Sequence, residues 1–394
     1  MSYIQAGTPR FRRALSALFS GALVTFAVLY SVQPLLPVLA AHFHVSPAEA
    51  SLTLSISTLL MGGALLLAAP LSLVWGPKRI MTVSMAMAAI LAMGTAIAPN
   101  FWMLVGIRGL LGVALAGIPA VAMGYVGDEF DPGSLGRAMG IYVSGTTIGG
   151  MGGRILVGSL TDAWSWRGAL GTVGAVSIAL TVWFVRGLPP SRHFTPQPDA
   201  LRNLWPSLKK NLHSRELIWL YVLPFLLMGG FVTIYNYITF LLTGPPYHLS
   251  QTLVGWIFLV YLAGTGSSAW LGRLADQHGR SRVLPGAIVL MLAGLLVTLF
   301  PPLVFRVGGL AVMTFGFFGA HAVASGWVAR RALTSAAEAS SLYLFFYYAG
   351  SSIFGVLGGL IWTRWHWTGI IAMVGVLAAI ALFVALHLGR WRVR

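Results

Sequence analysis

Two arginines, Arg108 and Arg154, lie inside long apolar stretches of this 394-residue chain. An arginine within a bilayer costs a few kcal/mol on insertion scales, so it normally faces a partner group or a water-filled cavity. None of the nine acidic residues lies inside such a stretch. Both guanidinium groups are therefore predicted to line a neutral or electropositive cavity and to bind an anionic or polar group. The alternative is snorkelling, because each arginine lies roughly 10 Å from one end of its stretch at 1.5 Å per residue.

Other side chains within the apolar stretches are candidates for proton transfer and solute binding. His321 is the best placed to carry a proton, because histidine changes charge near neutral pH. The alternative for His321 is a hydrogen-bonded packing residue. Aromatic and amide groups suit a pocket that stacks on and hydrogen-bonds a small organic solute. The predicted pocket residues of this kind are Tyr30, Gln33, Tyr142, Tyr235, Asn236, Tyr237, Tyr261, Tyr347 and Tyr348.

The patterns expected of an enzyme or a metalloprotein are missing from the apolar stretches. The chain has no cysteine, and the stretches contain no Ser/His/Asp set, no paired carboxylates and no cluster of metal ligands. We therefore expect no catalytic residues, no bound metal and no cofactor.

The elements that must position these residues are membrane-spanning helices. Hydrophobic residues make up 57% of the chain and charged residues 9%, against about 25% charged in an average globular protein. A crossing needs roughly 20 mostly apolar residues. Stretches that meet this length are 14–38, 51–73, 80–98, 101–126, 138–160, 168–188, 217–242, 251–271, 283–303, 307–329, 341–361 and 368–389. The sequence thus predicts an all-α membrane protein with twelve transmembrane helices.

The orientation follows from the distribution of lysine and arginine. These residues are concentrated in alternate loops, and only Arg167, Arg306 and Arg364 lie in the other loops. Because basic loops stay on the cytoplasmic side, both termini are predicted to be cytoplasmic in a cytoplasmic (inner) membrane. The net charge of +16 is then explained by topology and by attraction to anionic lipid. We expect no nucleic-acid partner, because the charges are scattered over short segments.

The chain is organised as two similar halves. A proline-rich polar interval near 187–216 separates six stretches from six, and such a composition predicts a semi-rigid extended connector. Predicted boundaries are 1–188 for the first six-helix bundle, 189–215 for the linker and 216–394 for the second bundle. Segment 142–153 (YVSGTTIGGMGG) recurs 205 residues later as 347–358 (YYAGSSIFGVLG), and 75–79 (WGPKR) recurs 203 residues later as 278–282 (HGRSR). Repeated halves are typical of secondary transporters.

Several of these segments resemble motifs of the major facilitator superfamily. Segment 272–282 (GRLADQHGRSR) is similar to its loop motif, 108–112 (RGLLG) to its fourth-helix motif, and the glycines of 142–153 to its gating motif. Similarity to the YnfM-like (acriflavine-sensitivity) branch extends over nearly the whole chain. It is carried by 30–37 (YSVQPLLP), 51–58 (SLTLSIST), 148–154 (IGGMGGR), 191–194 (SRHF), 236–238 (NYI) and 340–345 (SSLYLF).

The loop motif implies a latch on the cytoplasmic side. Asp276, steadied by Arg280, is expected to face the start of the eleventh span and to close that side while the pocket faces outward, since a helix N-terminus favours negative charge. The alternative is a solvated charge pair in an ordinary turn. In the first half Leu73 stands where Asp276 stands in the second. Residues near the end of the fourth span could substitute for the missing acid by facing Lys78 and Arg79, and they are Asp128, Glu129 and Asp131.

Glycines in the fifth span form a smooth helical face. Gly145, Gly149 and Gly153 recur every four residues, which lets another backbone approach closely. The face is interpreted as tight packing, as a gating surface that slides on a helix of the other half, or as both. The same use is expected of Ser351, Gly355 and Gly359 in the eleventh span. Gly229 and Gly230, five and six residues after Pro224, predict a weak point in the seventh span.

The function indicated by these features is secondary active transport of a small organic solute by alternating access. The resemblance implies efflux of amphipathic compounds such as acridines. We further expect a proton-coupled antiporter that acts as a monomer. The missing interior carboxylate favours uptake or exchange of a neutral or anionic metabolite as the alternative. A non-transporting membrane sensor is disfavoured, because the loops have no room for an output domain.

Overall fold

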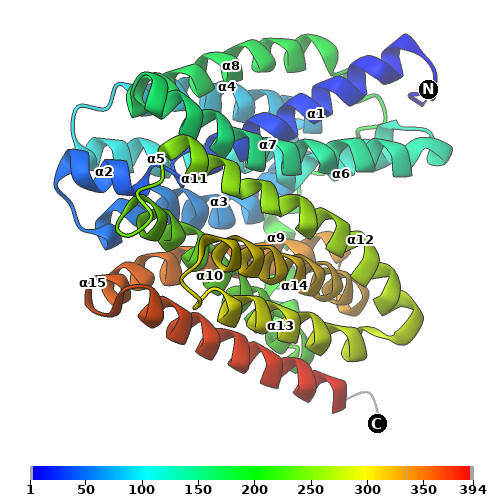
Figure 1. The fold of residues 1–394 in the computed structure, drawn as a ribbon. Helices are drawn as coiled ribbons and strands as arrows, with labels where there is room; N and C mark the ends of the chain where they lie inside the picture. The colour runs from blue at the N-terminus through cyan, green and yellow to red at the C-terminus, as the bar shows by residue number, and fades with distance from the viewer. Residues whose placement is uncertain (1–2, 334, 391–394) are drawn as a thin grey trace.

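The computed structural model describes residues 3–333 and 335–390, and nearly all of these residues are helical. Ten helical stretches of the described chain are long and apolar enough to cross a membrane. Two of them join consecutive helices, Phe101–Glu129 (α5 and α6) and Gln251–His278 (α11, η2 and α12). Another of the ten, α15 (Ala336–Arg390), reverses at His366, where the backbone is not helical, and therefore crosses twice. Helix α7 (Leu135–Ala163) has the length of a crossing and a sequence rich in glycine, serine and threonine. These helices account for the twelve predicted crossings, arranged in two bundles (Figure 1).

Several helices of the first bundle begin after a polar N-cap residue. Side chains of Thr8, Ser46, Asn100 and Ser165 accept a hydrogen bond from a backbone N–H of the first turn, as N-cap residues do. The helices of this half are α1 (Pro9–Tyr30), α2 (Leu36–Phe43), α3 (Pro47–Trp75), α4 (Pro77–Ala96), α5 (Phe101–Leu115), α6 (Gly117–Glu129), η1 (Pro132–Ser134), α7 and α8 (Trp166–Gly187).

The second bundle repeats this pattern after the linker. Ser214 and Ser250 cap the helices that follow them. The elements of this part of the chain are α9 (Ala200–Leu212), α10 (Arg215–Thr243), α11 (Gln251–Ile257), η2 (Phe258–Val260), α12 (Tyr261–His278), α13 (Arg280–Val297), α14 (Leu303–Arg331) and α15.

Two helices differ from their predicted course. The first crossing is not one helix over 14–38, because α1 ends at Tyr30 and α2 begins only at Leu36. Pro34 lies in the gap and has no N–H to continue the helical hydrogen bonds. The weak point predicted at Gly229 and Gly230 is absent from the described chain, because α10 runs unbroken from Arg215 to Thr243. Those glycines make room for Phe354 and Val374, which a Cβ atom at either position would meet within 3.0 Å.

The linker is only partly the extended connector that its prolines predict. Residues 188–199 have no regular structure, but α9 is helical and buries Leu208. The extended part is fixed to the first bundle. Tyr125 donates to the Pro189 carbonyl at 2.9 Å, and the Gln197 N–H donates to the Leu73 carbonyl at 2.9 Å. The extended part of the linker therefore lies against the first half, whereas α9 contacts α3 of the first half and α10 and α15 of the second.

The sequence suggested that the acids at the end of α6 face the basic pair at the start of α4. The described contacts do not include such a pairing. Glu129 is buried and accepts a hydrogen bond from the His193 N–H of the linker at 2.7 Å, while Lys78 donates to the Leu188 carbonyl. A substitute latch between Asp128–Asp131 and Lys78 or Arg79 is thus absent from the described contacts. The buried carboxylate instead holds the linker on the bundle.

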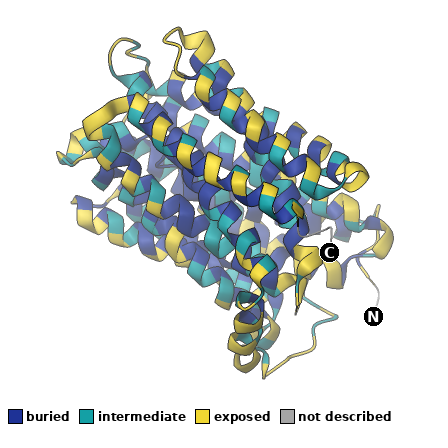
Figure 2. Ribbon diagram, turned by 90° about the horizontal axis from the view of Figure 1, so that it is seen from below, coloured by how far each residue is buried: buried dark blue, intermediate teal, exposed yellow. Residues whose placement is uncertain are grey.

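The two ends of the helical bundles carry different segments of the chain. The linker side carries α9, the start of α1 and the described end of α15, and the far side carries α2 and the reversal of α15 at His366 (Figure 1). Around the bundles, apolar residues such as Ile90 and Phe383 are 69% and 67% exposed. Figure 2 shows exposed residues on the outer faces of the helices and buried residues between them. Such an outer surface suits lipid.

Candidate functional site

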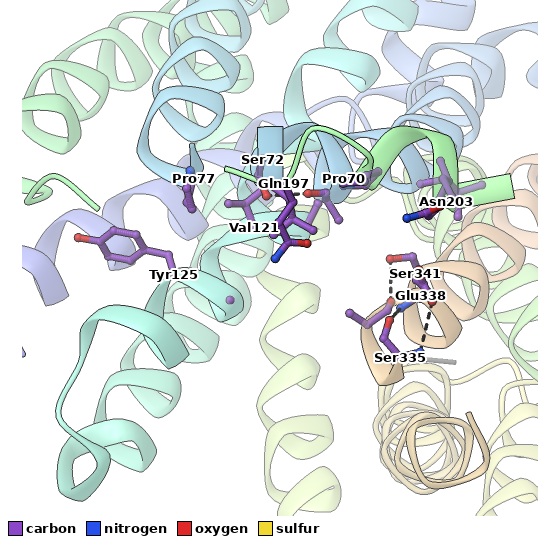
Figure 3. Close-up of a pocket in the computed structure, with 18 of the residues that line it drawn as sticks. Pro70, Ser72, Pro77, Val121, Tyr125, Gln197, Asn203, Ser335, Glu338 and Ser341 are labelled. Carbon is purple, nitrogen blue, oxygen red and sulfur yellow. Dashed lines mark hydrogen bonds between the residues drawn. The ribbon is translucent and has the colours of Figure 1, made fainter. Parts of the chain in front are cut away.

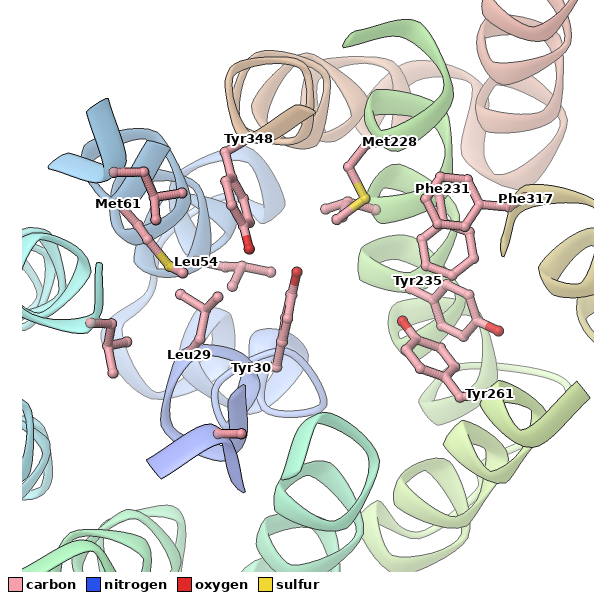
Figure 4. Close-up of a cluster of buried hydrophobic side chains, with 14 of the residues drawn as sticks. Leu29, Tyr30, Leu54, Met61, Met228, Phe231, Tyr235, Tyr261, Phe317 and Tyr348 are labelled. Atoms are coloured by element: carbon pink, nitrogen blue, oxygen red, sulfur yellow. The ribbon is translucent and has the colours of Figure 1, made fainter. Parts of the chain in front are cut away.

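A cavity of about 210 Å³ lies between the two bundles. Its wall is mostly aromatic, and Figure 4 shows Tyr30 and Tyr348 across from a group that includes Phe231, Phe317 and Tyr261. The Phe231 and Phe317 rings stack with centroids 3.9 Å apart. The first half contributes Phe26, Tyr30, Thr146, Thr147, Gly150 and Arg154, and the second half Met228, Phe231, Val232, Tyr261, Phe317, Phe318, His321, Leu344, Tyr347 and Tyr348. The cavity thus offers planar apolar surfaces with few polar groups.

Arg154 supplies the one full charge among these lining residues. Its Nε donates to Gln33 Oε1 at 2.7 Å and its Nη1 to the Gly150 carbonyl at 2.6 Å. Nη2 makes no hydrogen bond with the described residues, and no described carboxylate pairs with the guanidinium. Three ring faces surround the charge, with centroids 4.1 Å (Tyr30), 4.8 Å (Phe258) and 4.9 Å (Tyr261) from its central carbon. Cation–π contacts of this kind stabilise a buried guanidinium.

Gln33 connects this arginine to the second half. Its side-chain nitrogen donates to Asn236 Oδ1 at 2.8 Å, and both residues are fully buried. The two residues are 203 positions apart, the separation that relates Gly76 to Gly279 in the repeat. They join the two halves directly, side chain to side chain. Arg154, Gln33 and Asn236 form a continuous polar path from α7 to α10.

His321 lies in the cavity wall on the opposite half from Arg154. Its Nδ1 is 2.9 Å from the Tyr343 hydroxyl, and its ring stacks with that of Phe317 at 6.2 Å. The histidine is thus both hydrogen-bonded and open to the cavity. Both of its predicted uses, packing and proton transfer, are compatible with this placement.

Arg108 does not line the cavity. Its Nε, Nη1 and Nη2 donate to the carbonyls of Thr53, Val28 and Leu29 at 2.9, 2.9 and 2.5 Å. Helix ends leave carbonyls without helical partners, and the end of α1 within the bundle exposes those of Val28 and Leu29. Arg108 is 1% exposed, as is Arg154, so neither arginine snorkels to the surface. Arg108 serves as the cap of the broken helix.

The structure brings together six of the predicted pocket residues, which are Tyr30, Arg154, Tyr261, His321, Tyr347 and Tyr348. Tyr142, Tyr235 and Tyr237 are buried outside the wall; Tyr235 bonds to Thr314 and Tyr237 to the Gly355 carbonyl. Sequence reasoning missed the phenylalanines of the wall. Phe26 is four residues before Tyr30, and Phe231 four before Tyr235, so helical spacing from the polar candidates was the available signal.

A second hollow of about 370 Å³ opens between the bundles on the linker side. Figure 3 shows Pro70, Val121 and Tyr125 of the first half on one wall and Glu338 and Ser341 of the second half on the other. Gln197 and Asn203 of the linker also border it (Figure 3). Ser341 lines this cleft and Leu344, three residues on, lines the central cavity. The halves are thus apart on the linker side.

On the far side the halves are in close contact. A Cβ atom on Gly359 of α15 would lie 2.3 Å from the Ala48 Cα of α3, and one on Gly158 of α7 would lie 2.5 Å from the Gln251 carbonyl oxygen. The Asp162 carboxylate accepts from the backbone N–H groups of Gln251 and Thr252 at 3.2 and 2.7 Å. An acid of the first half therefore caps the N-terminus of α11, where negative charge is favoured.

The glycine face of α7 packs within its own half, which agrees with the packing interpretation, while its use as a gating surface stays a prediction. Cβ atoms on Gly145, Gly149 and Gly153 would lie 2.3 to 2.7 Å from backbone atoms of Phe19, Leu23 and Ala27 in α1. Spacing defined the face but not its partner. In α15, by contrast, Gly355 and Gly359 do face α3 of the other half.

Asp276 pairs with the predicted Arg280 and with one further arginine. It accepts from Arg280 at 2.8 Å and from Arg330, at the end of α14, at 3.4 Å. The start of α15 is not among its described partners. Its side chain is 58% exposed, and its gating role stays a prediction.

The family is settled by sequence comparison. Residues 18–263 match the family model described as Major Facilitator Superfamily. The chain belongs to the major facilitator superfamily. An uncharacterised MFS-type transporter of Bacillus subtilis, YybF, is 47% identical over 99% of this chain and 96% of its own length. The inner membrane transport protein YnfM of Escherichia coli is 42% identical over 98% of this chain and 93% of its own.

Solved structures agree with this assignment at the level of the fold. A bacterial homologue of the human lysosomal transporter Spinster, inward-facing and unoccupied, matches with a TM-score of 0.78 over 98% of both chains at 15% identity. A mutant of the nucleoside transporter NupG matches with a TM-score of 0.75 over 95% of this chain and 99% of its own, also at 15% identity. The chain is therefore a multi-pass secondary transporter of this superfamily and not an enzyme.

Proposed function

We propose that this protein exports a small organic solute across the cytoplasmic membrane by alternating access, with proton entry driving the export. The linker side is the cytoplasmic side in this proposal, because the basic loops gather there. The solute binds in the aromatic cavity between the bundles. The observation that carries the proposal is the asymmetric contact between halves, which are closed on the far side at Gly359 and Asp162 and separated by a cleft on the linker side.

This asymmetry is what one state of a rocking transporter requires. A solute from the cytoplasm would enter by the cleft, whose wall on α15 continues into the cavity wall between Ser341 and Leu344. Rocking would then part the far-side contacts and close the cleft. Asp276 would reach its latching position at the start of α15 only in that second state.

His321 is the group we assign to proton coupling. It lies in the cavity wall, and no described carboxylate lines the cavity. A proton on His321 would add positive charge to the cavity and change its affinity for a charged solute, so protonation and solute binding are linked. Uptake or exchange without a proton is the second candidate, favoured by the missing carboxylate.

Flux into proteoliposomes tests the proposal. Vesicles holding the purified chain are given benzoate, benzamide or benzylammonium as radiolabelled probes, with and without an imposed pH gradient. We expect carrier-dependent movement of at least one probe, accelerated by the gradient and reduced in His321→Gln. Leu110→Ala, a change at a residue 61% exposed on the lipid-facing surface, is the matched control and should transport normally. Equal flux with and without the pH gradient would support uptake or exchange without a proton. Absence of flux for all three probes would contradict the proposed export.

A further inference from the structure

We infer that the solute carries an anionic group, and that this group binds Arg154 and loosens the bridge from Gln33 to Asn236. The inference rests on the proposed function, because it concerns the same cavity. It names the class of solute as a small aromatic or otherwise planar apolar monoanion. It also assigns to Gln33 the role of a positioning residue that links solute binding to the far-side closure.

The charge of the cavity is the first step. Arg154 is 1% exposed and lacks any described carboxylate partner. Its described partners are one amide oxygen, one carbonyl and three ring faces. A buried charge without a counter-ion is unfavourable. An anionic solute would supply the missing charge, and the electrostatic attraction would be strengthened by the desolvated surroundings.

The free donor of the guanidinium is the second step. Nη2 has no acceptor among the described residues, and Arg154 lines the cavity. A carboxylate or similar oxyanion can accept from two guanidinium nitrogens at once, which is the geometry arginine favours. The pair would be Nη2 of Arg154 together with either its Nε, released from Gln33, or its Nη1, released from the Gly150 carbonyl.

The shape of the cavity limits the rest of the solute. Its volume of about 210 Å³ is below the roughly 300–1,000 Å³ of pockets for drug-sized ligands. Phe231 and Phe317 stack in its wall at 3.9 Å, and Tyr30 and Tyr348 face them. One planar ring beside the guanidinium therefore fits better than an extended polycyclic dye.

The link to the far side runs through Gln33. Its oxygen accepts from Arg154 and its nitrogen donates to Asn236, so the two hydrogen bonds fix the orientation of one amide. An anion that takes the Arg154 donor leaves this amide free to turn. The hydrogen-bonded path from Arg154 in α7 through Gln33 to Asn236 in α10 is then weakened, although the solute does not itself contact the far-side residues.

Binding measurements with three probes of similar shape test the inference. Benzoate, benzamide and benzylammonium present one ring with a negative, neutral or positive substituent. We expect benzoate to bind wild-type protein best, with a loss of about tenfold to a hundredfold in Arg154→Gln, the effect of losing charge-assisted hydrogen bonds. Arg167→Gln is the matched control, because that arginine caps carbonyls of Ala96 and Ala98 away from the cavity.

A second variant separates charge from folding. Gln33→Glu places a carboxylate 2.7 Å from the Arg154 Nε position now bonded to Gln33, so the internal acid should compete with the solute and weaken benzoate binding at least tenfold while preserving thermal stability. Benzoate affinity that survives both Arg154→Gln and Gln33→Glu, or benzamide affinity equal to that of benzoate, would overturn the inference. Gradient-driven flux of benzylammonium alone would also overturn it and would leave the proposed function intact.

Discussion

The fifth helix of each half, α7 in the first and the first arm of α15 in the second, shows what the two halves share and what they do not. Position 154 of α7 corresponds to position 359 of α15 at the repeat separation of 205 residues. Arg154 carries the charge of the cavity, whereas Gly359 allows α15 to approach α3. The halves therefore share helix packing, while one position serves chemistry in the first half and closure in the second.

The first helix of each half differs in the same way. Helix α1 ends at Tyr30 and needs Arg108 to satisfy its carbonyls, whereas α10 is continuous to Thr243. Asn236 is thus held in a regular helix, and its partner Gln33 lies in the interruption after α1. The first half thus carries Arg108 and Arg154, and the second half carries most of the aromatic wall.

Removing the cap of α1 should have the largest effect. Arg108→Ala removes three buried hydrogen bonds from the guanidinium to backbone carbonyls, and hydrogen bonds of a charged group are worth about 1.5–3 kcal/mol each. We expect a loss of about 3 kcal/mol or more in stability, with little expression. Arg108→Lys should recover only part of it, because one ammonium cannot reach three acceptors in the fork geometry. Thermal unfolding in detergent, compared with lipid-facing Leu110→Ala, measures the effect, and wild-type stability of Arg108→Lys would contradict the capping role.

A leucine in either glycine face distinguishes packing from closure. Gly149→Leu should destabilise the fold by about 1–3 kcal/mol, the usual cost of overpacking, because its partner is α1 of the same half. Gly359→Leu should remain folded, since the clash with α3 is relieved when the halves part on the far side. Gly152→Leu is the control, with nothing within 4 Å of its Cβ position. Equal unfolding temperatures for Gly149→Leu and Gly152→Leu would contradict the packing assignment.

The far-side cap should be weaker than the glycine contact. Asp162→Asn removes a charge at a helix N-terminus, an interaction worth about 0.3–1 kcal/mol, and should raise the population open to the far side about twofold to fivefold. Because the chain has no cysteine, a single Thr147→Cys in the cavity wall reports opening by its labelling with an impermeant maleimide.

Glu49→Gln is the matched control for this measurement. Glu49 also accepts hydrogen bonds at a helix start, but its partner Ser46 lies in the same half. Its loss should leave labelling unchanged. Equal labelling of the wild type and Asp162→Asn would show that the carboxylate does not hold the far side closed.

The smallest effect on stability is expected for Asp276→Asn. Its partners Arg280 and Arg330 are in its own half and the carboxylate is exposed, so the change should cost less than about 1 kcal/mol. Transport should nevertheless fall, because the latch of the other state is lost. Normal flux, together with unchanged labelling of Thr147→Cys from the far side, would remove Asp276 from the gating residues.

The fold was more predictable than the contacts between its parts. Length and hydropathy define each crossing locally, and the repeat of 142–153 in 347–358 indicates two halves. The interruption after Tyr30 could have been read from Pro34, and the place of Arg154 in the cavity followed from the cost of burying its charge. Helical spacing identified the face of Gly149 but could not identify α1 as its partner, because many helices can accept such a face.

Some contacts had no signal in the sequence at all. Asp162 is one acid at a loop boundary, and only the three-dimensional structure brings it to the start of α11, 89 residues away. Glu129, at the end of α6, was one of three acids proposed to face Lys78 and Arg79, but its carboxylate accepts a hydrogen bond from a backbone N–H of the linker. Irregular segments such as 188–199 contribute partners that neither periodicity nor charge pattern reveals.

The hydrogen bond between Gln33 and Asn236 has a consequence for the origin of the chain. In a dimer of identical subunits, residues near the two-fold axis contact their own copies. The two halves of this fold are parallel repeats around such an axis, and Gln33 and Asn236 touch where the halves meet. The amide pair has the form of such a self-contact, which duplication and fusion of one half would leave at the axis. An amide is well suited to that use, because it is both donor and acceptor and can therefore pair with itself.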